Sequence, residues 1–126
     1  MTDSRITILI ADDDLEILRM LRRALSENYR VVEAHNGREA LELIAAEHPA
    51  MVVLDVMMPE LNGWEVAKQL RKNRDTQHIG ILMLTAIGER LNEMTSPLYG
   101  ADDQLDKPFD LDEVLERIDA ILQNRS

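Results

Sequence analysis

Short apolar segments alternate along the chain with segments whose apolar residues recur every three or four positions. The short segments read RITILIA (5–11), YRVVEA (29–34), AMVVLDV (50–56), GILMLTA (80–86) and DDQLDK (102–107). Most of them are rich in branched residues and nearly continuous in apolar character, which is typical of strands buried on both faces. The last segment is assigned mainly from its place in the alternation. The pattern therefore predicts five strands.

The intervals between these segments have helical spacing. The clearest case is the stripe Leu111, Val114, Leu115, Ile118, Ile121 and Leu122. Weaker stripes occur at 18, 21 and 25, at 40, 41 and 44, and at 66, 67 and 70. NGRE (36–39) and DLDE (110–113) each place a glutamate three positions after a capping residue, which predicts a helix start. Five strands alternating with five helices predict an α/β domain, with helices on both faces of a parallel sheet.

Composition narrows the classes of function. The chain has 126 residues, a net charge of −10 and no cysteine. The length suits one domain with a sizeable core. The negative charge argues against direct binding of nucleic acid or an anionic membrane, and favours cations or basic protein surfaces as partners. The lack of cysteine excludes disulfides and thiolate metal sites and is compatible with a cytoplasmic location. No apolar run approaches the ~20 residues of a membrane span, and the first residues lack the pattern of a signal peptide.

Polar residues stand where four of the predicted strands end. Three aspartates occupy 12–14, Asp55 ends the third strand, Thr85 the fourth and Lys107 the fifth. In open α/β sheets, ligands bind beyond the carboxyl ends of the strands. Clustered carboxylates suit a hard divalent cation such as Mg²⁺, whereas a lysine and a hydroxyl suit a phosphoryl group.

Each of these residues also has a purely structural interpretation. The aspartates at 12–14 are compatible with a solvated helix start, Thr85 with an ordinary strand position and Lys107 with a surface lysine. Asp55 is compatible with a turn, although an aspartate after the apolar run VVL would be partly buried and would need a partner. The motifs have to be weighed together.

In combination, the motifs DD, LD…MP…G, LTA and DKPF resemble the receiver domain of two-component response regulators, including the chemotaxis regulators. The resemblance covers residues 5–124. It implies a flavodoxin-like, doubly wound (βα)5 fold whose five parallel strands have the order 2-1-3-4-5. It also implies that 1–126 is a single receiver domain, with no output domain in this sequence.

The resemblance assigns site residues by position. Asp55 matches the phosphoacceptor. The implied magnesium ligands are Asp12, Asp13, Asp55 and the backbone carbonyl of Met57, and Mn²⁺ is expected to substitute. The implied phosphate-binding and switch residues are Thr85, Ala86 and Lys107, and the bond from Lys107 to Pro108 is expected to be cis. Asp14 lies outside the family pattern and is interpreted as a first-turn residue of the first helix, favoured there by the helix dipole.

By the same resemblance, the chain is a phosphorylation-controlled signalling switch in the cytoplasm. A histidine kinase or a phosphotransfer protein would supply the phosphoryl group, and an unidentified downstream protein or output domain would read the result. The expected catalysis is limited to the protein's own phosphorylation and slow autodephosphorylation, so a dedicated enzyme is not implied. Neither membrane nor direct nucleic-acid binding is expected.

Several positions depart from the family pattern or bear on the lifetime of the phosphorylated state and on dimerisation. Gln104 stands where activating receivers often have an aromatic residue, and Pro97 predicts that the helix between the fourth and fifth strands is short, kinked or irregular. Met57 and Ile87 are apolar where rapidly resetting receivers place polar residues, which predicts a long-lived phosphorylated state. Asp103 and Arg117 match positions used in receiver dimers, so a homodimer stays open.

Two alternative functions remain at this stage. One is a protein-interaction module that keeps the fold and relays a signal with little or no phosphorylation, for which Gln104 is the best support. The other is a metal-dependent hydrolase. It is disfavoured because LDVMM lacks the second aspartate that aspartyl-phosphate phosphatases of the haloacid dehalogenase type place two residues after the nucleophile.

Overall fold

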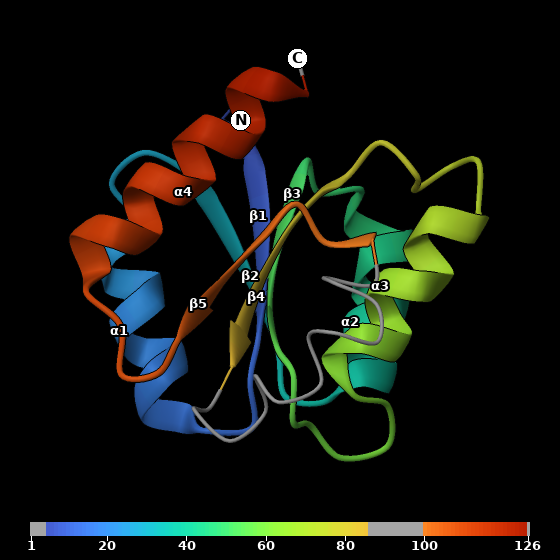
Figure 1. Cartoon of the computed structure of the whole chain (residues 1–126), viewed down its shortest axis with the longest axis horizontal. Helices are drawn as coiled ribbons and strands as arrows, with labels where there is room; N and C mark the ends of the chain where they lie inside the picture. Colours follow the sequence, from blue (N-terminus) through green and yellow to red (C-terminus); the bar gives the residue numbers. More distant parts are fainter. Residues whose placement is uncertain (1–4, 86–99, 126) are drawn as a thin grey trace.

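The computed structural model describes residues 5–85 and 100–125, which form a parallel five-stranded sheet between two layers of helices (Figure 1). The strands are β1 (Thr7–Ala11), β2 (Arg30–Ala34), β3 (Met51–Asp55), β4 (Gly80–Thr85) and β5 (Asp103–Asp106). The helices are α1 (Leu15–Leu25), α2 (Gly37–Glu47), α3 (Gly63–Lys72) and α4 (Leu111–Asn124). The spatial order β2-β1-β3-β4-β5 confirms the predicted fold class and strand order.

The predicted elements agree with the observed ones over the described residues. Each of the five strands begins and ends within two residues of its predicted bounds. Four of the five predicted helices are present among residues 5–85 and 100–125. The fifth, with Pro97, was expected between β4 and β5 and falls outside the described residues, as do Ala86 and Ile87.

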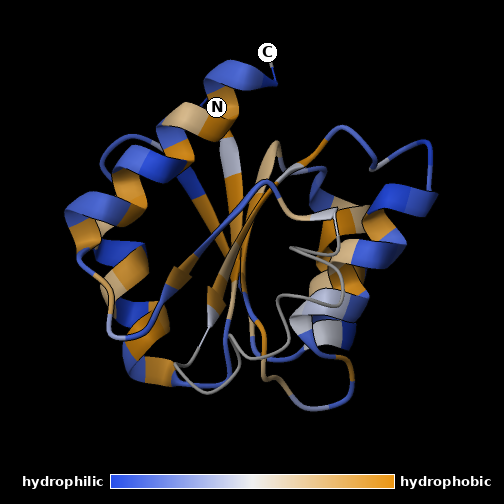
Figure 2. Cartoon of the chain, in the orientation of Figure 1, coloured by the Kyte–Doolittle hydropathy of each residue, from blue (hydrophilic) through white to orange (hydrophobic). Residues whose placement is uncertain are grey.

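Each face of the sheet has its own hydrophobic core. Helices α2 and α3 cover one face and α1 and α4 the other, and apolar residues concentrate where helices and sheet meet (Figure 2). Strand β3 is buried throughout and serves both cores, with Val52 and Leu54 on the α2–α3 side and Met51 and Val53 on the α1–α4 side. Burying such side chains contributes about 1.5–3 kcal/mol each, which explains the continuous apolar character of this segment.

Polar side chains cap the helix starts. The predicted caps at Asn36 and Asp110 are confirmed, and Asn62 adds a complete capping box at the start of α3. The placement of Asp14 in the first turn was wrong. Asp14 is the N-cap of α1, and its carboxylate accepts a 2.9 Å hydrogen bond from the backbone N–H of Glu16. A carboxylate at the cap satisfies a backbone donor that has no partner within the helix.

Gly63 brings the start of α3 against the end of β3. A Cβ atom at this position would lie 2.5 Å from the backbone oxygen of Asp55, a distance that real Cβ atoms essentially never show. The Gly63 N–H donates to the carbonyl of Val56 at 2.8 Å. The absence of a side chain therefore lets α3 fix the backbone immediately around Asp55.

At the amino ends of β4 and β5, an ion cluster joins three elements. Asp102 accepts hydrogen bonds from Arg71 of α3 (3.2 Å), from Arg125 at the end of α4 (2.9 Å) and from the backbone N–H of Ile81 in β4 (2.8 Å). We call Arg71, Asp102 and Arg125 the amino-edge cluster. It ties the end of the last helix to the start of the sheet.

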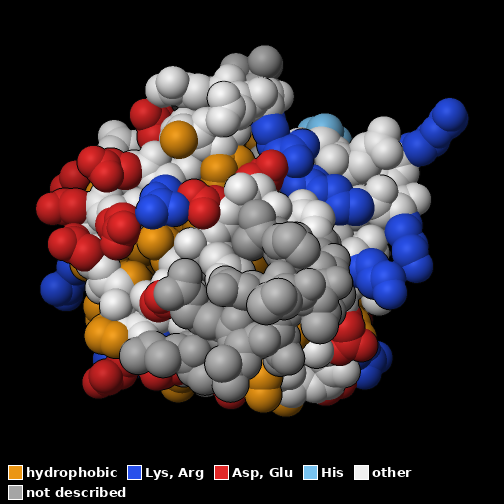
Figure 3. All heavy atoms as spheres, in the orientation of Figure 1, with side chains coloured by type: hydrophobic (Ala, Val, Ile, Leu, Met, Phe, Trp, Pro, Cys, Tyr) orange, Lys and Arg blue, Asp and Glu red, His pale blue; other side chains and the backbone are white. Residues whose placement is uncertain are grey.

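Charge is unevenly distributed over the surface. Figure 3 shows acidic side chains gathered over α4 and basic ones toward α3. Exposed acidic residues on α4 include Asp112, Glu116 and Asp119. Within residues 5–85 and 100–125, no helix has the length and apolar character needed to cross a membrane.

Candidate functional site

The buried polar side chains of the described chain lie at the carboxyl ends of the strands. Among residues 5–85 and 100–125, the buried polar or charged residues are Asp12, Asp55 and Thr85, each at most 4% exposed. Asp12 follows β1, while Asp55 and Thr85 end β3 and β4. Burying polar groups costs free energy unless they find partners. Their placement at one edge marks this edge as the candidate site.

Lys107 joins the two buried carboxylates. Its Nζ atom lies 3.0 Å from Oδ2 of Asp12 and 3.1 Å from Oδ1 of Asp55. Lys107 follows β5, and its backbone N–H donates to the carbonyl of Thr85 at 2.6 Å. The peptide bond between Lys107 and Pro108 is cis. The lysine therefore reaches across the edge of the sheet from β5 to the ends of β1 and β3.

The charges of the two buried carboxylates, Asp12 and Asp55, favour binding of a cation in addition to Lys107. Burial, with the nearby charge of Asp12, raises the pKa of Asp55 to about 6, although contact with Lys107 opposes the rise. Burial likewise raises the pKa of Asp12, against the hydrogen bonds from Asp14 and Lys107. Burial alone would lower the pKa of Lys107, but the contacts with both carboxylates outweigh it and raise this pKa. One ammonium thus stands against two buried carboxylates, which leaves the site short of positive charge.

Asp13 completes a set of carboxylates that could hold a metal ion. One oxygen from each of Asp12, Asp13 and Asp55 can be chosen so that all lie within 4.8 Å of one another. Asp13 is exposed, whereas the other two are buried, so the set opens to solvent on one side. Oxygen ligands with room for water are what Mg²⁺ requires. The donor set fits that ion.

Met57 lies beside this set. A backbone hydrogen bond from Met57 lowers the pKa of Asp55, against the larger effects of burial and of Asp12. Met57 is 62% exposed, so its side chain is open to solvent. Its role as a ligand through the backbone carbonyl stays a prediction.

The hydroxyl of Thr85 faces β5. Its Oγ1 donates to Oδ1 of Asp106 at 3.2 Å and, at the longer distance of 3.5 Å, to the backbone oxygen of Leu105. Asp106 was not singled out from the sequence, because its contact with Thr85 depends on the register that pairs these two residues across β4 and β5. Gln104 is half-buried and pairs with Met83 in the same register.

The residues matched to receiver dimers pair within the chain. Nη1 of Arg117 on α4 lies 2.5 Å from Oδ2 of Asp103 on β5, and Nη2 lies 3.4 Å from Glu113. Contact with Asp103 raises the pKa of Arg117. A homodimer through this face stays a prediction, and it would have to exchange or share this ion pair.

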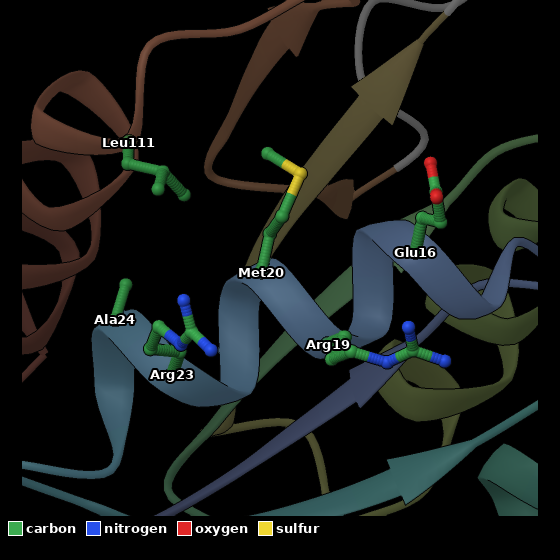
Figure 4. A pocket seen from close by; sticks show the side chains of 6 residues that line it. All are labelled: Glu16, Arg19, Met20, Arg23, Ala24 and Leu111. Atoms are coloured by element: carbon green, nitrogen blue, oxygen red, sulfur yellow. The ribbon is translucent and has the colours of Figure 1, made fainter.

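A groove of about 510 Å³ runs between α1 and α4 (Figure 4). Its lining residues are Glu16, Arg19, Met20, Arg23, Ala24 and Leu111. Met20 also lines a second hollow, of about 370 Å³, together with Lys107, Pro108 and Phe109. Met20 therefore borders both hollows, and the second of them extends to Lys107.

Comparison with known proteins adds independent information. The family model of the response regulator receiver domain matches residues 8–119. Response regulator MprA of Mycolicibacterium vanbaalenii is 49% identical over 122 residues, which cover 94% of this chain and 51% of that protein. The probable transcriptional regulator ycf27 of Cyanophora paradoxa is 46% identical over 117 residues, which cover 92% of this chain and 48% of the relative. The chain thus spans about half the length of the curated relatives it matches.

Solved structures agree with this match. The receiver domain of the Francisella response regulator 1452 superposes with a TM-score of 0.85 at 32% identity, covering 97% of this chain and 100% of that one. A CheY-like receiver domain protein from Methanospirillum hungatei JF-1 has a TM-score of 0.83 at 28% identity, covering 97% of each chain.

Proposed function

Because this chain belongs to the family of response regulator receiver domains, we propose that it is a switch of two-component signalling in which Asp55 accepts a phosphoryl group. The observation that carries the proposal is the meeting of Asp55, Asp12 and Lys107 at the carboxyl edge of the sheet. Thr85 is buried at the end of the neighbouring strand. Two buried carboxylates that share one lysine cost free energy on folding, and such arrangements cluster at functional sites.

The chemistry assigns a task to each side chain. An oxygen of the ionised Asp55 carboxylate attacks the phosphorus of a phosphohistidine, the new P–O bond forms as the P–N bond breaks, and the bonding electrons leave with the imidazole nitrogen. Lys107 places a positive charge beside Asp55 and would balance charge on the phosphoryl oxygens, as in other phosphoryl transfers. Thr85 can donate its hydroxyl to one of these oxygens.

Mg²⁺ fits the same site. Asp12, Asp13 and Asp55 would hold it, with the backbone carbonyl of Met57 as a further ligand and Mn²⁺ as a substitute. When bound, the ion would neutralise negative charge on the carboxylates and the phosphoryl oxygens. It would also favour the ionised form of Asp55, which burial disfavours.

The partners follow from the family and from the relatives. We propose a histidine kinase or a phosphotransfer protein as the donor, in the cytoplasm. The relatives include a protein described as a probable transcriptional regulator, and the chain matches about half of its length. We therefore propose that a DNA-binding output, on the same polypeptide or on a partner, reads the state of this domain.

The proposal is tested by weighing the intact protein after incubation with Mg²⁺ and a small phosphodonor such as acetyl phosphate. We expect one phosphate adduct on the wild type and none on Asp55→Asn, because an amide lacks the nucleophilic charge. A wild type that acquires no adduct would instead support the interaction module suggested by Gln104. Sustained release of phosphate over many turnovers would support a hydrolase.

Asp13→Asn should weaken Mg²⁺ binding about tenfold or more, since even changes beside a metal site cost roughly 10–100-fold. Isothermal titration with Mg²⁺ measures the effect, and Asp75→Asn, an exposed loop aspartate, is the matched control. An unchanged affinity in Asp13→Asn would remove this residue from the ligand set.

Once formed, the phosphorylated state should be long-lived. Hydrolysis needs a water held in line with the scissile P–O bond, and neither Met57 nor Ile87 can orient one by a strong hydrogen bond. The backbone of Met57 hydrogen-bonds to Asp55, and its exposed thioether offers no strong hydrogen bond to a water there. We expect the variant Met57→Asn with Ile87→Glu to lose phosphate about tenfold faster, because polar side chains there can hold the attacking water. The measurement is the decay of the phosphate adduct in Mg²⁺ buffer. Equal decay rates in the wild type and in this variant would contradict the proposal that Met57 and Ile87 lengthen the lifetime of the phosphorylated state.

A further inference from the structure

The Thr85 hydroxyl is buried and turned toward β5. Thr85 is 1% exposed, so its hydroxyl cannot rely on bulk water and must find an acceptor within the protein. The nearer of its two acceptors is the carboxylate of Asp106, at 3.2 Å, and the carbonyl of Leu105 is at 3.5 Å. Among the described residues, this hydroxyl makes no hydrogen bond to Asp55 or Lys107. It is therefore held on the side of the strand away from the carboxylate proposed to carry the phosphoryl group.

The backbone of Thr85 is fixed independently of its side chain. Its carbonyl accepts a 2.6 Å hydrogen bond from the N–H of Lys107, and the residue is paired with Asp106 across β4 and β5. A strand end held in this way cannot move easily toward Asp55. The hydroxyl can, however, change partner by rotation about the Cα–Cβ bond, which is a change between staggered side-chain conformations.

We propose that Asp106 is a positioning residue that restrains Thr85 and thereby opposes phosphoryl binding at Asp55. The inference rests on the proposed function, because it concerns the same site. To reach a phosphoryl oxygen, Thr85 has to give up one anionic acceptor for another, so part of the hydrogen-bond energy gained at the phosphoryl group is offset by the bond lost to Asp106.

The first measurement concerns the unphosphorylated protein alone. Three-bond couplings of the Thr85 side chain report its rotamer, and at 14.4 kDa the protein is well suited to solution NMR. We expect a single rotamer in the wild type, a mixture in Asp106→Ala, and the wild-type rotamer in Asp106→Asn, because an amide oxygen still accepts the hydrogen bond. An unchanged rotamer in Asp106→Ala would overturn the proposal.

The second measurement is a titration with beryllofluoride, an analogue of the phosphoryl group, in the presence of Mg²⁺. Asp106→Ala should bind the analogue about tenfold more tightly than the wild type, the size expected for loss of one hydrogen bond to a charged group. Removing a carboxylate also reduces repulsion of an anion, and that effect does not depend on Thr85. The same substitution is therefore made in a Thr85→Val background, which has no hydroxyl to restrain.

The double-mutant cycle separates these two effects. A larger gain in affinity when Thr85 is present than in the Thr85→Val background supports restraint of the hydroxyl. Equal gains in both backgrounds, or none in either, overturn the proposal. If the wild type binds no beryllofluoride and acquires no phosphate, the proposed function fails and the effect of Asp106 on phosphoryl binding fails with it. The coupling constants would still decide separately whether Asp106 holds Thr85.

Discussion

Replacing Asp55 with asparagine should stabilise the metal-free protein by about 2–3 kcal/mol at pH 7.5. Burial and the charge of Asp12 raise the pKa of Asp55 from 3.8 to about 6, and each tenfold change in proton affinity corresponds to about 1.4 kcal/mol. A carboxyl with a raised pKa binds its proton more tightly in the folded state. Above pH 6 the group is ionised both in the folded and in the unfolded chain, so folding then carries the full cost of burying the charge.

The dependence on pH has a definite sign. As the pH falls from 7.5 through 6 toward 4, Asp55 becomes protonated in the folded protein first, so the wild type should gain stability over this range. Asp55→Asn lacks this titration, and its advantage should disappear near pH 4. Urea unfolding across pH 4–8, with chelator present, measures both curves, and Asp75→Asn is the exposed control. If the variant is no more stable than the wild type at pH 7.5, burial of the ionised Asp55 carboxylate does not carry the free-energy cost proposed here.

Replacing Lys107 with methionine should have the opposite effect, a loss of about 3 kcal/mol of stability at pH 7.5 without metal. The Nζ atom lies close to Asp12 and Asp55, and the lysine side chain is 22% exposed, so solvent screens these contacts only in part. Removing one partner from a buried ionic group leaves uncompensated charge, which typically costs about 3–5 kcal/mol. Methionine keeps most of the apolar length, so the loss reports charge more than packing.

The double variant Lys107→Met with Asp55→Asn provides the control for this prediction. It removes the buried carboxylate of Asp55 together with the partly buried ammonium of Lys107, and leaves Asp12 as the buried carboxylate of the described residues. The two single effects alone would sum to a stability within about 1 kcal/mol of the wild type. Because Asp55 has lost its neighbouring positive charge in Lys107→Met, Asp55→Asn should stabilise that background by more than it stabilises the wild type, so the double variant should be more stable than this sum in urea unfolding. Additive effects would show that Lys107 and Asp55 do not interact at the separation seen in the structure.

The fold could be predicted from the sequence because each strand segment shows, in its own residues, the continuous apolar character of a strand buried on both faces. Segments such as AMVVLDV and GILMLTA are almost entirely apolar, and β3 and β4 are buried at every position. The rule that ligands bind at the carboxyl ends of parallel strands then brings Asp12, Asp55 and Lys107 to one edge. The structure places these three residues in contact there.

The sequence does not predict which of several neighbouring charged residues a given side chain contacts. The pairing of Lys107 with a phosphoryl group stays a prediction, and the sequence did not indicate that its ammonium also contacts both Asp12 and Asp55. Asp106 is one of several aspartates around β5, and only the β4–β5 register shows that it is the one facing Thr85. Such contacts depend on tertiary geometry on the scale of a single hydrogen bond, and hydrophobic patterning does not encode that level of detail.

The same limit applies to Asp103 and Arg117. Their matched positions suggested contacts between protomers, yet α4 packs beside β5 so that the two side chains already meet within one chain. The opposite charges of Asp103 and Arg117 indicate that the two side chains attract each other. The sequence does not show whether they pair within one protomer or between two.

The amino-edge cluster holds the end of the last helix at the edge of the sheet that lies opposite Asp55. Arg125 is held to Asp102 at the start of β5, whereas Asp55 lies at the opposite end of the sheet. A strand of five residues spans about 16 Å, so a polypeptide attached after Arg125 begins roughly that far from Asp55. Groups bound at Asp55 therefore do not contact such an attachment directly. A fluorophore or fusion partner placed there would leave the approach to the carboxylates open.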